Sequence, residues 1–194
     1  MRPRQYIPVA AACLAIQFCA GVLYMWSVFA GPIHGEYGWD QAAVSFTASL
    51  MLLVFVGGMA LGGGIADRIG PRLVSCAGTI LFCLGWFLSS LLGSESIPWM
   101  IYLSYSGMSG IGAGFVYSCA LSCMQRWLPN RKGLASGLSL SAFGFSVVFF
   151  TPVAELLLSR FGVAATFRIF ALIFFIVMMP ASLFIKYPAE VSSG

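Results

Sequence analysis

Apolar residues are concentrated in six long blocks, which short polar or glycine- and proline-containing stretches separate. Each block has room for the roughly 20 apolar residues that a membrane-spanning helix needs. The pattern therefore predicts an all-α integral membrane protein, with a single six-transmembrane-helix bundle over residues 1–194. The expected helices are 7–30, 41–65, 71–92, 98–124, 133–158 and 164–186.

Proline and glycine positions suggest where several of these helices begin and end. Gly31-Pro32 is expected to end the first helix, followed by a polar loop with His34, Glu36 and Asp40. Pro71 suits the first turn of the third helix, and Pro152 predicts a kink in the fifth. The first apolar block is longer than the ~7–15 residues of a signal-peptide core, so we expect an uncleaved first span.

Composition excludes an ordinary soluble domain. Hydrophobic residues make up 60% of the chain and charged residues 8%, whereas soluble domains carry about 25% charged residues. The net charge of +4 is better explained by membrane topology than by nucleic-acid binding. We therefore expect a lipid bilayer as the surroundings and no nucleic-acid partner.

Basic residues predict the orientation in the membrane. Eight of the ten flank the expected helices on one side, and Arg160 and Arg168 lie on the other. The positive-inside rule places the larger group, and so both termini, in the cytoplasm of a multi-pass protein of the plasma (inner) membrane. The larger group is Arg2, Arg4, Arg68, Arg72, Arg126, Arg131, Lys132 and Lys186. The acidic residues Glu36, Asp40 and Glu95 fall on the opposite side.

Cysteine and histidine usage argues against a metal site, a cofactor or an enzyme. The six cysteines lie within apolar blocks and form no CxxC pair, and His34 is the single histidine. Leu134–Gly137 resembles the serine motif of rhomboid proteases, but that chemistry needs a histidine on a later helix, and His34 precedes it. We expect no catalytic residues and no cofactor.

Glycines recur at four-residue spacing in the second, fourth and fifth helices. The pairs are Gly58/Gly62, Gly110/Gly114 and Gly133/Gly137. In lipid, small residues at this spacing let helix backbones approach closely. The pattern predicts tight helix packing, on faces that could also slide or rock.

The turn between the second and third helices carries a charged motif, Gly64-Ile-Ala-Asp-Arg-Ile-Gly-Pro-Arg72. Its glycines permit a tight turn, and Asp67 is favoured near a helix N-terminus. Arg68 and Arg72 can bridge to Asp67, to helix carbonyls or to lipid phosphates, which could hold one face of the protein shut. The motif matches the G-x-x-D-R-x-G-x-R pattern of the major facilitator superfamily, and the resemblance implies a gating role. We assign to this gating motif Gly64, Asp67, Arg68, Gly70 and Arg72, with Arg131 and Lys132 from the later cytoplasmic loop.

A second segment narrows the resemblance. Arg126-Trp-Leu-Pro-Asn-Arg-Lys-Gly-Leu-Ala-Ser-Gly137 resembles the R-W-F-P-x-x-R-G-L-A-S-G segment of oxalate/formate antiporter-like proteins, which are related to monocarboxylate transporters. Residues 21–27 with Gly31-Pro32, and residues 110–117, are similar to the corresponding helices of the same group, although Met25 stands where relatives more often carry a small polar residue. The resemblance implies the N-terminal half of a twelve-helix fold. It also implies secondary active transport of small organic anions such as oxalate, formate or monocarboxylates, by antiport or symport with alternating access.

The same resemblance makes Tyr24, Trp26 and Tyr117 candidates to line a central cavity. Tyrosine hydroxyls and an indole N–H can donate hydrogen bonds to a small carboxylate. Gln17, a lone amide in the middle of the first helix, either faces this cavity or pairs with another helix. Glu155 and Arg168 are expected at the membrane interface.

In the resembling family the substrate path lies between two six-helix halves. We therefore expect this chain to need a second half as a partner, either a missing C-terminal half or a second copy of itself. The alternative is a non-transporting six-helix membrane protein that scaffolds or binds a partner. Continuation of the reading frame past Gly194 into six more spans would indicate that this chain is a fragment whose C-terminal half is missing.

Overall fold

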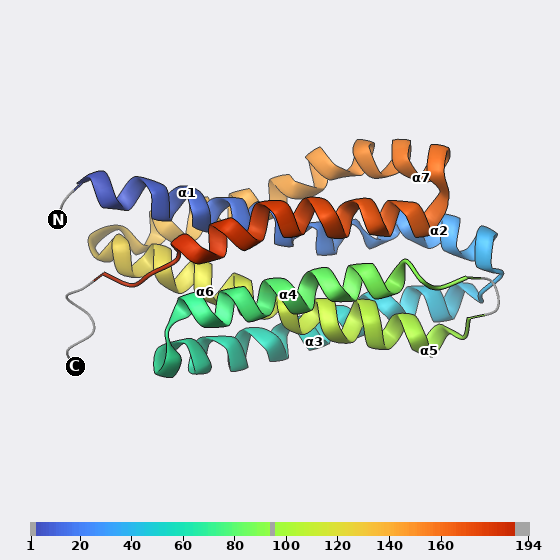
Figure 1. The fold of residues 1–194 in the computed structure, drawn as a ribbon, viewed down its shortest axis with the longest axis horizontal. Helices are drawn as coiled ribbons and strands as arrows, with labels where there is room; N and C mark the ends of the chain where they lie inside the picture. The colour runs from blue at the N-terminus through green and yellow to red at the C-terminus, as the bar shows by residue number, and fades with distance from the viewer. Residues whose placement is uncertain (1–2, 94–95, 189–194) are drawn as a thin grey trace.

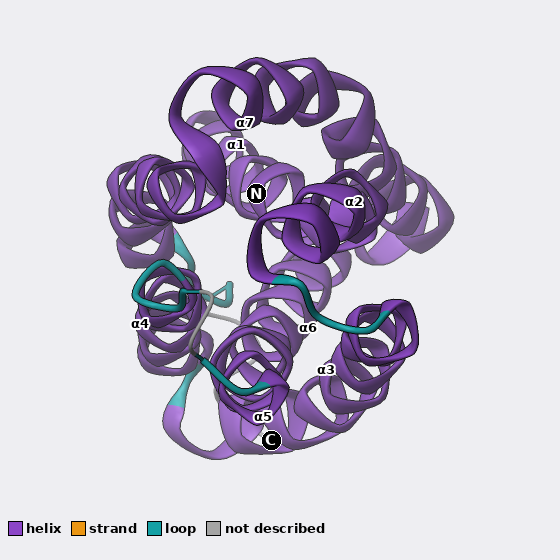
Figure 2. Ribbon diagram, turned by 90° about the vertical axis from the view of Figure 1, so that its right-hand side faces the viewer, coloured by secondary structure: helices purple, strands orange, loops and turns teal. Residues whose placement is uncertain are grey.

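The computed structural model describes residues 3–93 and 96–188, and all regular structure in these ranges is helical (Figures 1 and 2). This confirms the predicted all-α class. The main helices are α1 Pro3–Ala20, α2 Trp26–Tyr37, α3 Gln41–Ile69, α4 Pro71–Ser89, α5 Pro98–Ile101, α6 Gly110–Trp127 and α7 Lys132–Phe184. Shorter pieces connect them: the 3₁₀ helices η1 Gly21–Met25 and η3 Pro129–Arg131, and the π-helix η2 Tyr102–Ser109.

Five helical segments in the described part of the chain are long and apolar enough to cross a membrane. They are Tyr6–Tyr37, Gln41–Ile69, Pro71–Ser89, Pro98–Trp127 and Pro129–Phe184. Arg2, Glu95 and the side chain of Arg4, on which part of the orientation argument rests, lie outside the described residues. In Figure 1 the turn between α3 and α4 lies at the same end of the bundle as the end of α6 and the end of α7. We call this the Asp67 end, and the opposite end the Gly162 end.

The last segment, α7, is interrupted at Gly162. As a straight helix its 53 residues would measure about 80 Å, more than twice the ~30 Å of a bilayer core. Gly162 has φ 75° and ψ −180°, a conformation that is essentially restricted to glycine. The chain doubles back there, and α7 consists of two limbs, 132–161 and 163–184, which return along the bundle (Figure 1).

The first segment differs from its predicted bounds. It begins at Pro3, passes through η1 and continues in α2 as far as Tyr37, so the predicted end at Gly31-Pro32 is wrong. Pro32 removes only one backbone donor, and the fully buried Phe29 and Ile33 hold the helix across it. The helix ends instead at Tyr37 and is capped by Gly38, whose left-handed conformation (φ 67°) lets its N–H donate to the His34 carbonyl at 3.0 Å.

The fourth predicted helix contains the π-helix η2. Its widened turns displace backbone carbonyls, and serine side chains tie this stretch to its neighbours. Ser106 Oγ donates to the Thr47 carbonyl of α3 at 2.8 Å, and Ser109 Oγ donates to the Phe82 carbonyl of α4 at 3.2 Å. These bonds fix η2 between α3 and α4.

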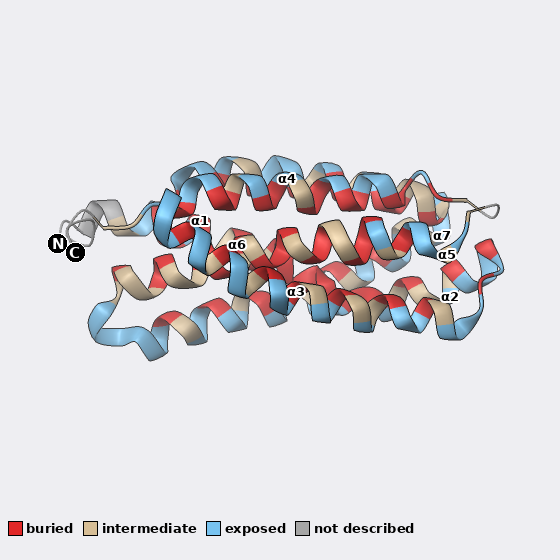
Figure 3. Ribbon diagram, turned by 90° about the horizontal axis from the view of Figure 1, so that it is seen from below, coloured by how far each residue is buried: buried red, intermediate tan, exposed pale blue. Residues whose placement is uncertain are grey.

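Burial is uneven around the bundle, as Figure 3 shows. The segments containing α1 and α6 are mostly buried, whereas α3 and α7 expose much of their apolar surface. Close glycine packing is confirmed between α3 and α6, where a Cβ added to Gly58 would lie 2.9 Å from the Ile111 carbonyl oxygen. It is not found at Gly133 and Gly137, which have no neighbouring atoms within 4 Å of such a Cβ among the described residues.

Candidate functional site

Four aromatic rings from four elements pack against one another. Tyr117 of α6 packs edge-on against Phe143 of α7 with ring centroids 5.1 Å apart, and Tyr24 of η1 packs against the same ring at 5.5 Å. Phe55 of α3 completes the group, 5.6 Å from Tyr117 and 5.9 Å from Phe143. We call these four residues the inner aromatic cluster. It brings together Tyr24 and Tyr117, which sequence analysis singled out, and adds Phe55 and Phe143, which it missed.

Local backbone structure explains how Tyr24 reaches this position. A Cβ on Gly21 would overlap the carbonyl oxygen of Phe143, so only glycine lets η1 lie directly against the first limb of α7. In this 3₁₀ turn only the Tyr24 side chain points away from the core. Leu23 and Met25 are buried, whereas Tyr24 is 54% exposed. The phenol of Tyr24 is therefore accessible while its ring rests on Phe143.

A hollow of about 520 Å³ lies beside Tyr24, between the first segment and α3. Its volume is typical of small-molecule pockets, which measure roughly 300–1,000 Å³. The lining is Leu23, Tyr24, Trp26, Ser27, Ala30, Gly31, Gln41, Ser45, Ala48 and Leu52. It contains hydroxyl and amide groups but no charged side chain, so the hollow offers neutral hydrogen bonds to a ligand. Ser27, Gln41 and Ser45 were not predicted as site residues, because single polar residues near helix ends are common.

Trp26 forms part of the wall of this hollow, but its N–H is already used. Nε1 donates to the Val44 carbonyl of α3 at 2.9 Å, and the ring packs on Tyr105 with centroids 4.7 Å apart. Since an indole has a single donor, Trp26 fixes α2 against α3 in this conformation. Donation from Trp26 to a substrate stays a prediction.

Gln17 is fully buried and contacts the backbone at Tyr117. Its Nε2 donates to the Tyr117 carbonyl at 3.4 Å, which links α1 to α6. Its Oε1 has no hydrogen-bond partner within the described residues. Gln17 therefore pairs with another helix, which is one of its two predicted alternatives. The bond to the Tyr117 backbone also helps to position the Tyr117 side chain.

The charged turn at the Asp67 end is shaped by Gly70 and Pro71. Gly70 has φ 94°, which favours glycine, and its N–H donates to the Ala66 carbonyl at 3.0 Å. Pro71 is the first residue of α4, as predicted. Asp67 accepts a 2.6 Å hydrogen bond from Nη2 of Arg126 at the end of α6. Its partner is thus on another helix, and not Arg68 or Arg72, the neighbours that sequence analysis considered.

Arg126 also contacts the chain beyond α7. Its guanidinium carbon lies 3.9 Å from the centre of the Tyr187 ring, a cation–π contact. Next to it, Trp127 Nε1 donates to the Lys186 carbonyl at 2.8 Å, and so does Cys123 Sγ at 3.2 Å. Burial raises the pKa of Tyr187 to about 12, although the nearby Arg126 acts to lower it. The phenol is therefore neutral at physiological pH.

Most other residues of the gating motif are exposed at the protein surface. Lys132 and Arg126 line a hollow of about 350 Å³ together with Ser122, Gln125 and Pro129. Arg131 closes the 3₁₀ turn η3, and Gly64 has open space around it. Arg68 and Arg72 are exposed, and the Asp67–Arg126 contact is the ion pair found within the described residues. No three His, Cys, Asp or Glu side chains converge into a metal-binding group in that part of the chain.

The chain is similar in sequence to known transporters. The family model described as Major Facilitator Superfamily matches residues 12–194. The oxalate:formate antiporter of Oxalobacter formigenes is 31% identical over 179 residues, which are 92% of this chain and 42% of that protein. Monocarboxylate transporter 13 of Rattus norvegicus is 33% identical over 142 residues, 73% of this chain and 32% of that protein. The chain therefore spans less than half the length of these relatives.

Proposed function

This chain belongs to the Major Facilitator Superfamily, and on that premise we propose that it forms the N-terminal half of a secondary transporter for small organic anions. It is a multi-pass membrane protein of a transporter family and not an enzyme. The proposed substrates are oxalate, formate or monocarboxylates, exchanged or co-transported by alternating access. The relatives named as an oxalate:formate antiporter and as a monocarboxylate transporter support this substrate class.

The observation that carries the proposal is the pair of phenols in the inner aromatic cluster. The hydroxyls of Tyr24 and Tyr117 have no hydrogen-bond partner among the described residues. Tyr24 lines the 520 Å³ hollow, and Tyr117, which is not part of that lining, packs on the same Phe143 ring as Tyr24. Two free O–H donors beside apolar rings suit a small carboxylate, because the donors bind its oxygens while the rings contact its carbon.

We propose that the two limbs of α7 are separate spans, which gives six. At 1.5 Å per residue, limb 132–161 would measure about 45 Å and limb 163–184 about 33 Å, and each exceeds the ~30 Å hydrocarbon core. With six spans both termini lie on the same side. The distribution of Lys and Arg supports a cytoplasmic location for both, in the plasma (inner) membrane.

A second six-helix unit is part of this proposal. The hollow contains no charged residue, and a carboxylate that leaves water for a membrane interior needs a compensating charge or strong donors. We propose that a C-terminal half, or a second copy of this chain, supplies a cation and covers the exposed apolar faces of α3 and of the first limb of α7. Opening and closing at the Asp67 end would then involve the Asp67–Arg126 pair.

Uptake into proteoliposomes tests the proposal. The reading frame after Gly194 shows which polypeptide to prepare: the longer product if it continues, or this chain, with its oligomeric state measured, if it stops. Labelled oxalate, formate and lactate are then presented to vesicles preloaded with each unlabelled anion. Anion-stimulated uptake supports the proposal. Absence of uptake by a verified two-half assembly would contradict it and favour a scaffold.

A further inference from the structure

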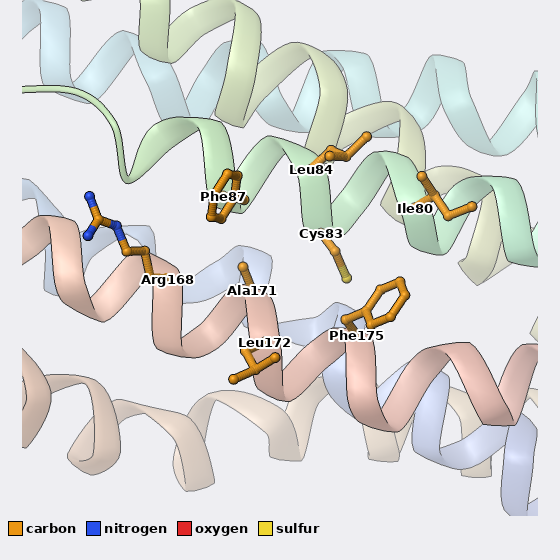
Figure 4. Close-up of a pocket in the computed structure, with 8 residues that line it drawn as sticks. All are labelled: Ile80, Cys83, Leu84, Phe87, Arg168, Ala171, Leu172 and Phe175. Atoms are coloured by element: carbon orange, nitrogen blue, oxygen red, sulfur yellow. The ribbon is translucent and has the colours of Figure 1, made fainter.

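An apolar groove runs along the outside of the bundle, between α4 and the second limb of α7 (Figure 4). It has a volume of about 440 Å³ and is open to the surroundings along one side. Its walls are the exposed side chains of Leu84, Phe87, Leu172 and Phe175, and its floor includes the small residues Cys83 and Ala171. Large residues flanking small ones therefore leave a channel parallel to the two helices.

The groove is long enough for a substantial part of a lipid chain. Along α4 it extends from Ile80 to Phe87, seven residues or about 10 Å at the rise of an α-helix. One leaflet of the hydrocarbon core is about 15 Å thick. The groove thus follows about two thirds of the depth of the leaflet at the Gly162 end.

One end of this apolar groove carries a cation, Arg168 (Figure 4). Its Nε donates to Ser90 Oγ at 3.3 Å, which leaves the four N–H groups of its two terminal nitrogens. Within the described residues no carboxylate lies at ion-pair distance from Arg168. Ser90 is the first residue after α4, so the guanidinium of Arg168 lies at the end of that span, near the membrane interface.

We propose that this groove binds an anionic phospholipid. The lipid phosphate accepts hydrogen bonds from the terminal nitrogens of Arg168, and one acyl chain lies between α4 and the second limb. Charge complementarity favours this occupant, because a guanidinium matches the geometry of a phosphate and binds it through two parallel hydrogen bonds. The site is on the outside of the bundle, separate from the inner aromatic cluster, and does not depend on transport.

Native mass spectrometry of the full chain in detergent tests the proposal. The protein is titrated with phosphatidylglycerol or phosphatidylcholine of identical acyl chains. We expect the anionic lipid to be retained about tenfold better, the effect of one charge-assisted contact. Arg168→Gln should bring the two lipids to near parity. Arg160→Gln removes the same charge at the same end but outside the groove, and should leave the preference intact.

Two further variants separate this proposal from its alternatives. Ala171→Leu fills the groove floor without changing charge, and should weaken retention of both lipids; if it does not fold, the two arginine variants still decide. Equal binding of both lipids by the unmodified chain, or equal losses in Arg160→Gln and Arg168→Gln, would overturn the proposal. The proposal would also be overturned if the preference for phosphatidylglycerol appeared only in Glu95→Gln. Glu95 would then form an ion pair with Arg168 in the unmodified chain and block the lipid phosphate. Stronger Arg168-dependent binding of dodecanoate than of phosphatidylglycerol would identify a fatty acid instead.

Discussion

Asp67 at the end of α3 is bonded to Arg126 at the end of α6, with 2.6 Å between Oδ1 and Nη2. The contact joins residues 59 apart in sequence and so ties the α3–α4 turn to another helix. The Asp67 side chain is 59% exposed and that of Arg126 32%. Exposed ion pairs typically contribute about 1 kcal/mol or less, so this pair can form and break at small energetic cost.

We expect Asp67→Asn to impair transport more than folding. The variant keeps a hydrogen-bond acceptor but loses the charge that orients Arg126. The free energy of unfolding should change by less than about 1 kcal/mol, whereas the anion exchange rate should fall about tenfold, a change of ~1.4 kcal/mol in the barrier. Thermal melting and exchange in proteoliposomes of the two-half assembly measure the two effects.

The matched control for this variant is Asp40→Asn, which removes an exposed carboxylate at the Gly162 end. It should change neither quantity appreciably. The charge reversal Asp67→Arg with Arg126→Asp should recover part of the exchange rate. Exchange by Asp67→Asn at the unmodified rate would show that the gating role is wrong.

Tyr187 supports Arg126 through its ring and not through its hydroxyl. The Tyr187 hydroxyl is buried without a hydrogen-bond partner in the described part of the chain. Tyr187→Phe should therefore leave exchange and stability nearly unchanged, since it keeps the cation–π contact and removes an unsatisfied polar group. Tyr187→Ala should lower both. Equal behaviour of the two variants would exclude a role for the ring.

Thermal melting at increasing alkaline pH gives an independent test of the burial of the Tyr187 phenol. Its pKa of about 12 in the folded protein lies above the ordinary value near 10. As pH rises, the unfolded chain therefore loses the proton first, so the contribution of the neutral phenol is fully present below about pH 10 and is lost as pH rises toward 12. The unmodified chain should lose more stability across this window than Tyr187→Phe; parallel curves would contradict the burial of the phenol.

The helical class and the approximate spans could be predicted because lipid imposes a length and an apolar composition on each span. The end of α2 could not be predicted from Gly31-Pro32. Glycine and proline act on the local backbone, whereas the helix continues past them because Phe29 and Ile33 are buried in the core. The π-helix η2 likewise depends on tertiary contacts such as Ser106 with Thr47. No periodicity in one sequence reveals such contacts.

Two members of the inner aromatic cluster were among the predicted substrate-binding residues, and their role in binding stays a prediction. Tyr24 and Tyr117 were found because they occupy segments that resemble transporter helices, and the structure places them on one ring, Phe143. Phe143 and Phe55 cannot be distinguished by sequence from other apolar residues. Their contacts with the two tyrosines depend on the packing of four separate elements. The partner of Asp67 was missed for the same reason, since local spacing suggested Arg68 or Arg72 while the fold brings Arg126 closer.

Glu36 is expected to stabilise the second limb of α7. Its Oε2 accepts a 3.2 Å hydrogen bond from the Val163 N–H, the first residue after Gly162. Carboxylates at helix N-termini are favoured by the exposed N–H groups there, and the negative charge contributes about 0.3–1 kcal/mol. Glu36→Gln should lower the melting temperature accordingly. Glu155→Gln, an exposed carboxylate on the first limb, is the control and should have little effect.

Tyr117→Phe is expected to weaken substrate affinity without affecting folding. The change removes one neutral donor and retains the ring packing on Phe143 and Phe55. A lost hydrogen bond of about 1 kcal/mol predicts a KM roughly fivefold higher, and Tyr24→Phe should act in the same way.

The control is Tyr102→Phe. The Tyr102 hydroxyl donates to the Ala43 carbonyl at 3.0 Å, so its loss should lower stability and leave KM unchanged. An unaltered KM in Tyr117→Phe across candidate carboxylates would assign Tyr117 to packing alone.

Two adjacent glycines of α3 allow a matched test of helix packing. Gly58 faces α6, where an added Cβ would lie 2.9 Å from the Ile111 carbonyl oxygen and 3.3 Å from the Cα of Gly114. Gly57 points to open space. Gly58→Ala should destabilise the protein by about 1–3 kcal/mol, because α3 and α6 must separate. Gly57→Ala should stabilise it by up to about 1 kcal/mol through helix propensity.

Thermal melting of each variant measures the difference in stability. Equal shifts of the melting temperature in the same direction would contradict close packing of α3 on α6. If Gly57→Ala is stable but slows exchange in the two-half assembly, the open face of α3 contacts the second half.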